Sequence, residues 1–172
     1  MPASVKGGLE LRKALRNYAP ELAKETQKEI AGVLKPIVKQ ARGFIPTQSP
    51  LSNWAREGGK FPPFNSTIMK RGIGYKTTPS KPNSRGFTAL AQIRNMSASG
   101  AIYETAGRKS PGTKPSSRPN FAESMGNLQG SGKDRGRAIF AAWEKDYGKA
   151  TVAVLKAIDN AGKTFNATVG KR

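Results

Sequence analysis

The 172-residue sequence contains neither cysteine nor histidine. The absence of cysteine excludes disulfide bonds and thiolate metal ligands, and it is compatible with a reducing compartment. The absence of histidine removes the side chain that most often acts as a general base or a metal ligand near neutral pH. Nucleophilic hydrolysis that depends on a histidine base is therefore excluded.

Acidic residues are scarce in the middle of the chain. Between Gly43 and Arg137 the acidic residues are Glu57, Glu104, Glu123 and Asp134. They fall on different expected secondary-structure elements. Two carboxylates that share acid–base chemistry must lie close together, and this region offers no closely spaced pair. The sequence therefore predicts a protein that is not an enzyme, with no catalytic residues, no cofactor and no metal site.

One glycine-rich segment resembles a phosphate-binding loop. It runs Gly130-Ser131-Gly132-Lys133. Its spacing from Gly126 is one residue too long, and Asp134 stands where such a loop needs serine or threonine. We interpret the segment as an ordinary loop.

Long hydrophobic runs are also missing. No stretch approaches the roughly 18 apolar residues of a membrane-spanning helix, and residues 1–6 lack the apolar run of a signal peptide. Hydrophobic residues make up 36% of the chain, with 19 glycines and 12 prolines. We expect one soluble domain over residues 1–172, used in a cytoplasm without a membrane partner, with a modest core and long connections.

What the sequence has in excess is positive charge. Its 30 Lys and Arg residues face 11 Asp and Glu residues, which gives a formal net charge of +19. The excess is concentrated in residues 43–137, where fifteen bases face four acids. A domain this basic repels itself, so it calls for an anionic partner, either nucleic acid, an anionic membrane surface or an acidic protein.

The spacing of apolar residues predicts an α+β fold. Residues 9–42 are expected to be helical, with a short helix from Leu9 to Asn17 and then a helix that starts at Pro20 and bends at Pro36. Residues 66–104 are expected to form an antiparallel meander of three strands, Ser66–Thr77, Gly86–Asn95 and Ala101–Glu104.

The remaining regions complete this expected architecture. Residues 105–137 are expected to be loop-rich, and residues 138–168 to form one long helix. The prediction is a bent N-terminal helix and a long C-terminal helix packed on a small antiparallel sheet with long basic loops. The connection around Trp54, Phe61 and Phe64 is either a satellite cluster on this domain or an arm that docks a neighbouring subunit.

Several short motifs, followed by a final helical region, succeed one another along about 140 residues. They are Gly8-Leu9, Pro20-Glu21-Leu22, the prolines Pro36 and Pro46, Tyr103-Glu104 with Gly107, and Arg118-Pro119-x-Phe121. Their order resembles that of the neck or tail-completion proteins of long-tailed bacteriophages, also called minor tail proteins. The chain departs from the family in two places, because Asn120 separates the proline from the aromatic residue and a glycine-rich insert follows Gly126.

The resemblance implies a non-enzymatic virion structural protein at the head–tail joint. Such a head–tail connector would join the tail-terminator and head-closure rings around the DNA path, as a homo-oligomeric ring in the neck or tail, assembled in the host cytoplasm. Its expected partners are the neighbouring tail-terminator, head-closure and tail proteins. The alternative function is that of a sequence-independent nucleic-acid-binding protein, which the charge favours.

Two groups of candidate site residues follow from the resemblance and the charge. The family motif, expected at an interface, comprises Tyr103, Glu104, Gly107, Arg118, Pro119 and Phe121. The bases expected to contact non-specific DNA in the channel or an acidic partner are Lys70, Arg71, Lys76, Arg108, Lys109 and Lys114. For Glu104 two roles remain open, a carboxylate paired with a nearby arginine or a salt bridge across a subunit boundary.

Overall fold

The computed structural model describes residues 7–52, 54, 62–84, 86–108, 124–131, 134–146 and 148–169. The chain forms two compact units, each assembled from separate segments. Unit 1 comprises Met1–Pro36, Tyr75–Gln92 and Gly148–Arg172, and unit 2 comprises Ile37–Gly74 and Ile93–Tyr147. The single domain expected over residues 1–172 stays a prediction.

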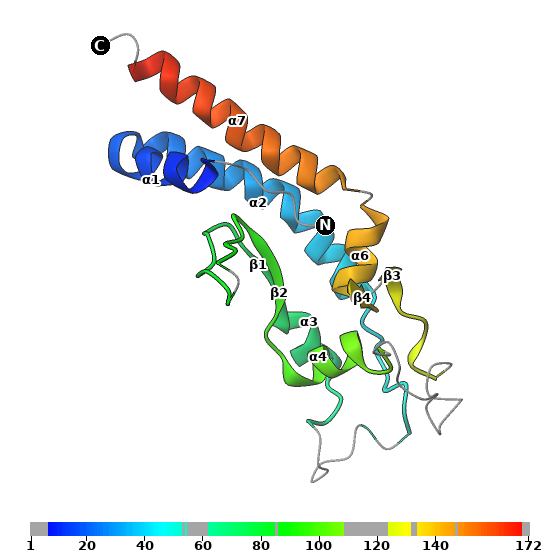
Figure 1. Cartoon of the computed structure of the whole chain (residues 1–172). Coiled ribbons are helices and arrows are strands. Elements are labelled where there is room, and N and C mark those ends of the chain that lie inside the picture. The colour runs from blue at the N-terminus through cyan, green and yellow to red at the C-terminus, as the bar shows by residue number, and fades with distance from the viewer. Residues whose placement is uncertain are drawn as a thin grey trace. The chain divides into compact units, whose positions relative to one another are not determined.

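Unit 1 is built mainly from helices (Figure 1). These are α1 (Gly8–Tyr18), α2 (Pro20–Gly43) as far as Pro36, and α7 (Lys149–Val169). Pro20 suits the first turn of α2 because its missing N–H would have no partner there, and Glu21 complements the positive end of the helix dipole. The helices share a core of Leu15, Ala23 and Ala161, against which Leu11, Ala19, Leu22 and Phe165 pack.

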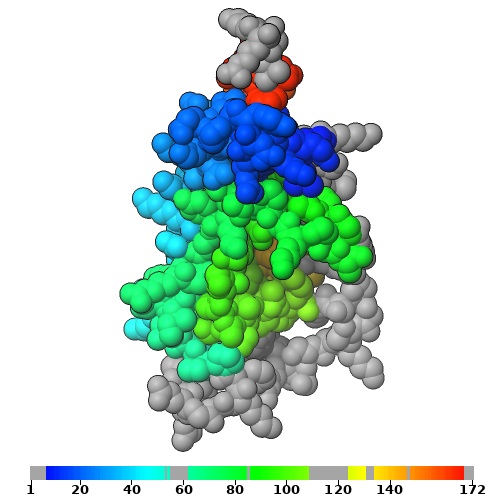
Figure 2. Space-filling view, turned by 90° about the vertical axis from the view of Figure 1, so that its left-hand side faces the viewer, coloured from blue at the N-terminus to red at the C-terminus, as the bar shows by residue number. Residues whose placement is uncertain are grey.

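The chain between β1 and β2 covers α1 in the same unit, where Figure 2 shows its green surface next to the blue surface of α1. The buried guanidinium of Arg12 donates to the carbonyl oxygens of Thr77 and Leu90. Within this segment the Ser80 N–H donates to the Ala89 carbonyl at 2.8 Å. Arg12 thus fastens both ends of the segment to α1.

Between α2 and α7 the described chain forms short helices and strands. They are α3 (Ser66–Gly72), β1 (Ile73–Lys76), β2 (Gln92–Asn95), α4 (Ala98–Thr105), β3 (Gln129–Ser131), β4 (Asp134–Gly136) and α6 (Ile139–Lys145). Strand β1 pairs with β2, and β3 pairs with β4 in an antiparallel ladder that places Gln129 opposite Gly136. In unit 2, α3 lies against α4, and α6 packs on β3 and β4 (Figure 1).

Unit 2 has its own buried apolar side chains. They come from the end of α2 and from the elements that follow it, and they include Ile37, Val38, Ala41, Ile45, Met69, Ile73, Met125, Ala138, Ala141 and Ala142. Alanines supply much of this interior, which lets short elements approach closely but removes little apolar area from water per residue. Hydrogen bonds to buried polar groups therefore matter more here than in a leucine-rich core.

The α+β class is confirmed, and so are the two N-terminal helices, because α1 and α2 lie where the apolar spacing places them. Helix α2 continues through Pro36 as expected. No helix among the described residues is apolar enough over sufficient length to cross a bilayer.

The expected three-stranded meander over residues 66–104 is wrong. Ser66–Gly72 is helical, because the Asn65 side chain caps it by accepting from the Ile68 N–H at 2.9 Å. Ala98–Thr105 is also helical, with the Ser97 hydroxyl accepting from the Gly100 N–H at 3.2 Å. Of the predicted strands only Ile73–Lys76 and Gln92–Asn95 are extended.

The C-terminal prediction also needs correction. The expected helix over residues 138–168 is divided into α6 and α7, and Gly148 between them has a φ of 76°. A residue in this left-handed conformation ends a helix, and glycine adopts it without steric cost. The region 105–137, expected to be loop-rich, contains the short β3–β4 ladder.

Candidate functional site

The carboxylate of Glu104 lies inside unit 2 at the start of α6. The side chain is 4% exposed. Its Oε2 accepts from the N–H groups of Ala138 at 2.8 Å and Ile139 at 3.1 Å, and its Oε1 accepts from the Phe140 N–H at 2.9 Å. The first N–H groups of a helix have no partner within it, and a negative charge there is favourable. Glu104, which belongs to α4, therefore caps α6.

Arg137 makes the reciprocal contact. It immediately precedes Ala138, is 5% exposed, and directs its guanidinium to the end of α4. Its Nη1 donates to the carbonyls of Tyr103 at 2.9 Å and Ala106 at 2.7 Å, and its Nε donates to the Gly126 carbonyl at 2.7 Å. The last carbonyls of a helix lack partners within it and favour a cation. Helix α6 thus receives its cap from Glu104 of α4, and α4 receives its cap from Arg137, two positions before α6.

Burial lowers the pKa of Arg137, and the nearby Tyr103 and Glu104 oppose that change. Removing a guanidinium from water is costly unless it is hydrogen-bonded. Three carbonyl acceptors meet that requirement here. We call Tyr103, Glu104, Gly136 and Arg137 the capping cluster.

Gly136 is required by the position of the Glu104 carboxylate. A Cβ on this residue would lie 2.1 Å from Oε1 of Glu104 and 2.8 Å from Cδ2 of Phe140. Both distances are far below ordinary van der Waals contact, and the carboxylate is held by three N–H donors, so it has little freedom to move. The absence of a side chain at 136 is what lets the carboxylate reach α6.

Tyr103 connects the capping cluster to the segment after α2. Its hydroxyl donates to the Phe44 carbonyl at 3.1 Å, and the Arg137 guanidinium carbon lies 6.0 Å from its ring centre. Burial raises the pKa of the Tyr103 phenol, and the negative charge of Glu104 adds to that rise, while Arg137 acts against it. The neutral phenol is therefore the favoured form.

Arg108, expected to contact DNA or an acidic partner, is engaged inside unit 2. Its guanidinium donates to the Arg135 carbonyl and lies 5.1 Å from the centre of the Phe140 ring, a cation–π distance. The preceding Gly107 has a φ of 78°, and this turns the chain at the end of α4. The Nη2 of Arg108 is thus engaged and its Nε is buried, which leaves Arg108 with fewer donors for an external phosphate.

Of the other predicted site residues, the structure describes three. Lys70 and Arg71 lie in the last turn of α3, and Lys76 ends β1, with Arg71 and Lys76 exposed. The predicted residues outside the described part of the chain are Lys109, Lys114, Arg118, Pro119 and Phe121. Tyr103 and Glu104 offer little surface to a neighbouring subunit because both are buried. Their interface role stays a prediction.

The aromatic connection is described only in part. Trp54 and Phe64 are half-buried and meet edge to face at 5.3 Å, and the Trp54 indole donates to the Pro62 carbonyl at 3.0 Å. Phe61 lies outside the described residues. The satellite cluster and the docking arm both remain open as predictions.

The sequence did not indicate that several arginines hold carbonyl groups of distant segments. Besides Arg137, Arg12 is buried, and desolvation lowers its pKa. Arg42 donates from Nε and Nη2 to the Ile73 carbonyl at 3.0 and 2.7 Å. The one available signal is Arg12 on the apolar side of α1, between Leu11 and Leu15, where a base is unexpected. Arg42 and Arg137 carry no such sign.

The chemistry of the cluster is structural. Its carboxylate, phenol and guanidinium all bind main-chain groups of their own unit, and a reacting molecule would find none of them free in this arrangement. Among the described residues no group of three or more acidic side chains is placed to hold a metal ion. Comparisons with protein-family models, with curated proteins and with solved structures found no match for this chain.

Proposed function

We propose that the chain is a non-enzymatic virion structural protein at the head–tail joint, completing the neck or tail of a long-tailed bacteriophage. The observation that carries the proposal is the order of family motifs from Gly8-Leu9 to Phe121, followed by a final helix, over about 140 residues in all. The central motif, Tyr103-Glu104 with Gly107, belongs to a cluster whose polar groups hold α4 and α6 together. Motif residues that stabilise the fold in this way are consistent with a structural protein, whose function depends on its shape.

The partners in this proposal are the tail-terminator and head-closure proteins, met by copies of the chain arranged as a ring. The charge supports an acidic neighbour or DNA in the channel, and of the predicted contact residues that the structure describes, Arg71 and Lys76 are exposed to such a partner. Arg108 is less suited, because its guanidinium is engaged within unit 2.

The proposal is tested in particles of the virus that encodes the chain. We expect mass spectrometry of purified particles to find the chain at a constant number of copies. Deleting its gene should leave filled heads and separate tails, and a plasmid copy should restore joined particles. Absence of the chain from intact particles, or turnover of a substrate by the purified chain, would overturn the proposal.

The second candidate is a free-standing nucleic-acid-binding protein without sequence preference. The formal charge of +19 is the observation that favours it. This candidate requires binding to naked DNA in the absence of any other protein, which the first does not.

A further inference from the structure

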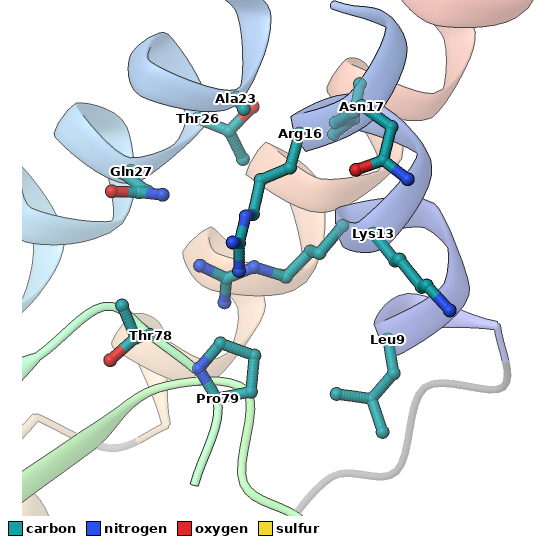
Figure 3. A pocket seen from close by; sticks show the side chains of 11 residues that line it. Leu9, Lys13, Arg16, Asn17, Ala23, Thr26, Gln27, Thr78 and Pro79 are labelled. Carbon is teal, nitrogen blue, oxygen red and sulfur yellow. The ribbon is translucent and has the colours of Figure 1, made fainter. Parts of the chain in front are cut away.

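A pocket of about 600 Å³ opens in unit 1 between α1, the start of α2 and the chain after β1. Figure 3 shows the Arg16 side chain extending into it from α1, opposite Thr78 and Pro79. The residues that line the pocket are Leu9, Arg12, Lys13, Leu15, Arg16, Asn17, Ala23, Thr26, Gln27, Thr78 and Pro79. We call it the α1 pocket.

The α1 pocket has an apolar floor and a basic rim. Leu15 is 1% exposed and Ala23 is also buried, as is Thr26, whose hydroxyl donates to the Leu22 carbonyl at 2.8 Å. Lys13, Arg16 and Asn17 are exposed around the opening, as is Leu9, which is 40% exposed. An apolar group that enters the pocket therefore contacts the buried side chains of the floor. The parts of the same ligand that stay at the opening lie next to the cations of the rim.

The cations at the rim are available to a ligand. Arg12 is committed to the carbonyls of Thr77 and Leu90. Lys13 and Arg16 have no hydrogen-bond or ion-pair partner among the described residues. They stand three positions apart on α1, so their side chains rise from the same face of the helix. No acid is among the residues that line the pocket, so no lining carboxylate offsets its positive charge.

These features favour an acidic protein segment as the occupant over nucleic acid. A buried floor can be reached by a side chain but not by the backbone of a convex duplex. Single strands usually bind by stacking their bases on aromatic rings, and none of the lining residues is aromatic. Carboxylates on either side of an apolar side chain would match both the rim and the floor.

We propose that the α1 pocket binds an acidic segment of a partner protein, which inserts an apolar side chain between two carboxylates. The inference is independent of the proposed function, because it uses only the geometry and charge of unit 1. It would hold for any partner that presents such a segment.

The test starts with a random peptide library selected on the full chain. We expect selected peptides to share an apolar residue flanked by Asp or Glu. A labelled consensus peptide is then titrated in fluorescence anisotropy against the wild type and two double variants of equal charge change. The pocket variant is Lys13→Glu with Arg16→Glu, and the control is Lys28→Glu with Lys35→Glu, two exposed positions of α2 outside the pocket.

The pocket variant should bind the peptide about tenfold more weakly or worse, and the control should bind it nearly as well as the wild type. Replacing the peptide's carboxylates by Gln, or its apolar residue by Ser, should each weaken binding to the wild type. Circular dichroism confirms that both variants are folded. Selection of peptides without acids, equal binding by both double variants, or displacement of the peptide only by a single-stranded oligonucleotide would overturn the proposal.

Discussion

At position 104 a carboxylate lies where a helix begins, in an interior that water does not reach. The N–H groups of Ala138, Ile139 and Phe140 would otherwise be buried without partners, and each such loss costs about 1–3 kcal/mol. Arg137 serves the end of α4 in the same way. In both cases a charged side chain forms hydrogen bonds with main-chain groups at a helix end, which have no partner within the helix.

Replacing Glu104 by Gln tests this role with little change in volume. The amide keeps one acceptor oxygen but turns an N–H₂ group toward a helix N-terminus, so at least one donor contact becomes repulsive. We expect the free energy of unfolding to fall by about 1–3 kcal/mol. The measurement is urea unfolding followed by tryptophan fluorescence, since Trp54 and Trp143 both lie in unit 2.

The matched control is Glu144→Gln, at an exposed position of α6. It makes the same chemical change on α6, the helix that Glu104 caps from α4, and should alter stability by no more than about 0.5 kcal/mol. If both variants lose the same stability, the cap is not what Glu104 supplies.

The glycine at 136 gives a second prediction at this scale. Alanine there would place a methyl group against Oε1 of Glu104, so we expect Gly136→Ala to lower the free energy of unfolding by about 1–3 kcal/mol. Gly74→Ala, at a position of unit 2 with open space around it, should change stability by no more than about 0.5 kcal/mol. Equal effects in denaturant unfolding would show that the space above Gly136 is not limiting.

The buried phenol of Tyr103 predicts a loss of stability in alkali. Its pKa is raised in the folded chain, whereas an unfolded tyrosine titrates near about pH 10. Below that pH both states hold the proton, and the stabilisation by Tyr103 is fully present. Above it the unfolded state releases the proton first, so the stabilisation is lost as pH rises through the folded pKa.

The measurement compares the wild type with Tyr103→Phe in denaturant titrations from pH 7 to pH 11. Near neutrality the variant should be less stable by about 1 kcal/mol, because it lacks the bond to the Phe44 carbonyl. That difference should shrink above about pH 10. Tyr18→Phe, at an exposed position, controls for the loss of one tyrosine. A difference that stays constant up to pH 11 would contradict the assignment.

At the scale of elements, the sequence predicts best where a helix is long and amphipathic. The apolar stripe of α1 and α2 extends over several turns, so single residues do not change the period. Ala98–Thr105 is different, because Ala101-Ile102-Tyr103-Glu104 is too short a run to distinguish a strand from a helix. The decisive signal was the cap at Ser97, which precedes a weak apolar pattern.

The contacts that build the capping cluster are beyond sequence reasoning for another reason. Glu104 meets Ala138 across 34 positions, and the segment between them has no period that fixes its path. The sequence singled out Tyr103, Glu104 and Gly107 but gave no reason to associate them with Gly136 and Arg137. The division of the C-terminal helix into α6 and α7 was also not predicted. From the sequence alone, Gly148 indicates only a weaker helix, and its positive φ is known only from the structure.

The attachment of residues 77–92 to α1 is an element-scale property that Arg12 controls. Replacing Arg12 by Met keeps an apolar stem of similar length but leaves the carbonyls of Thr77 and Leu90 without their donor. We expect amide hydrogens of Ser80, Asn83 and Ala89, which are bonded within the segment, to exchange about tenfold faster or more.

Hydrogen exchange read by mass spectrometry measures the effect peptide by peptide. Amides at the start of α6, which belong to unit 2, should keep their protection and serve as an internal reference. Lys13→Met, one residue away at an exposed position, should leave the segment unchanged. Unaltered exchange in 77–92 after loss of Arg12 would mean that other contacts hold it.

At the scale of the whole molecule, the formal charge overstates what is available to a partner. Arg12, Arg42, Arg108 and Arg137 each donate to main-chain carbonyls of their own unit. Their charges still contribute to the field around the protein, but the N–H groups that bind these carbonyls are not available to phosphate groups. Part of the arginine excess therefore stabilises the fold, whereas exposed bases without such contacts, among them Lys13, Arg16 and Arg71, remain for external contacts.

The two candidate functions can therefore be distinguished by how the affinity for DNA depends on salt concentration. For a free-standing DNA-binding protein, the logarithm of the binding constant falls linearly with the logarithm of the salt concentration. The slope is about −0.9 for each phosphate neutralised. Such a protein should bind a 30-base-pair duplex in anisotropy with a Kd of about 10⁻⁴–10⁻⁶ M or tighter at physiological salt, whereas the proposed head–tail component should bind it more weakly than about 10⁻⁴ M. Substituting Lys70, Arg71 and Lys76 by Ser should then change particle assembly more than DNA affinity. The opposite result would be tight DNA binding by the wild type, together with a triple variant that assembles normally but whose salt slope shows about three fewer phosphate contacts. Nucleic-acid binding would then be the better account, because those bases would face DNA.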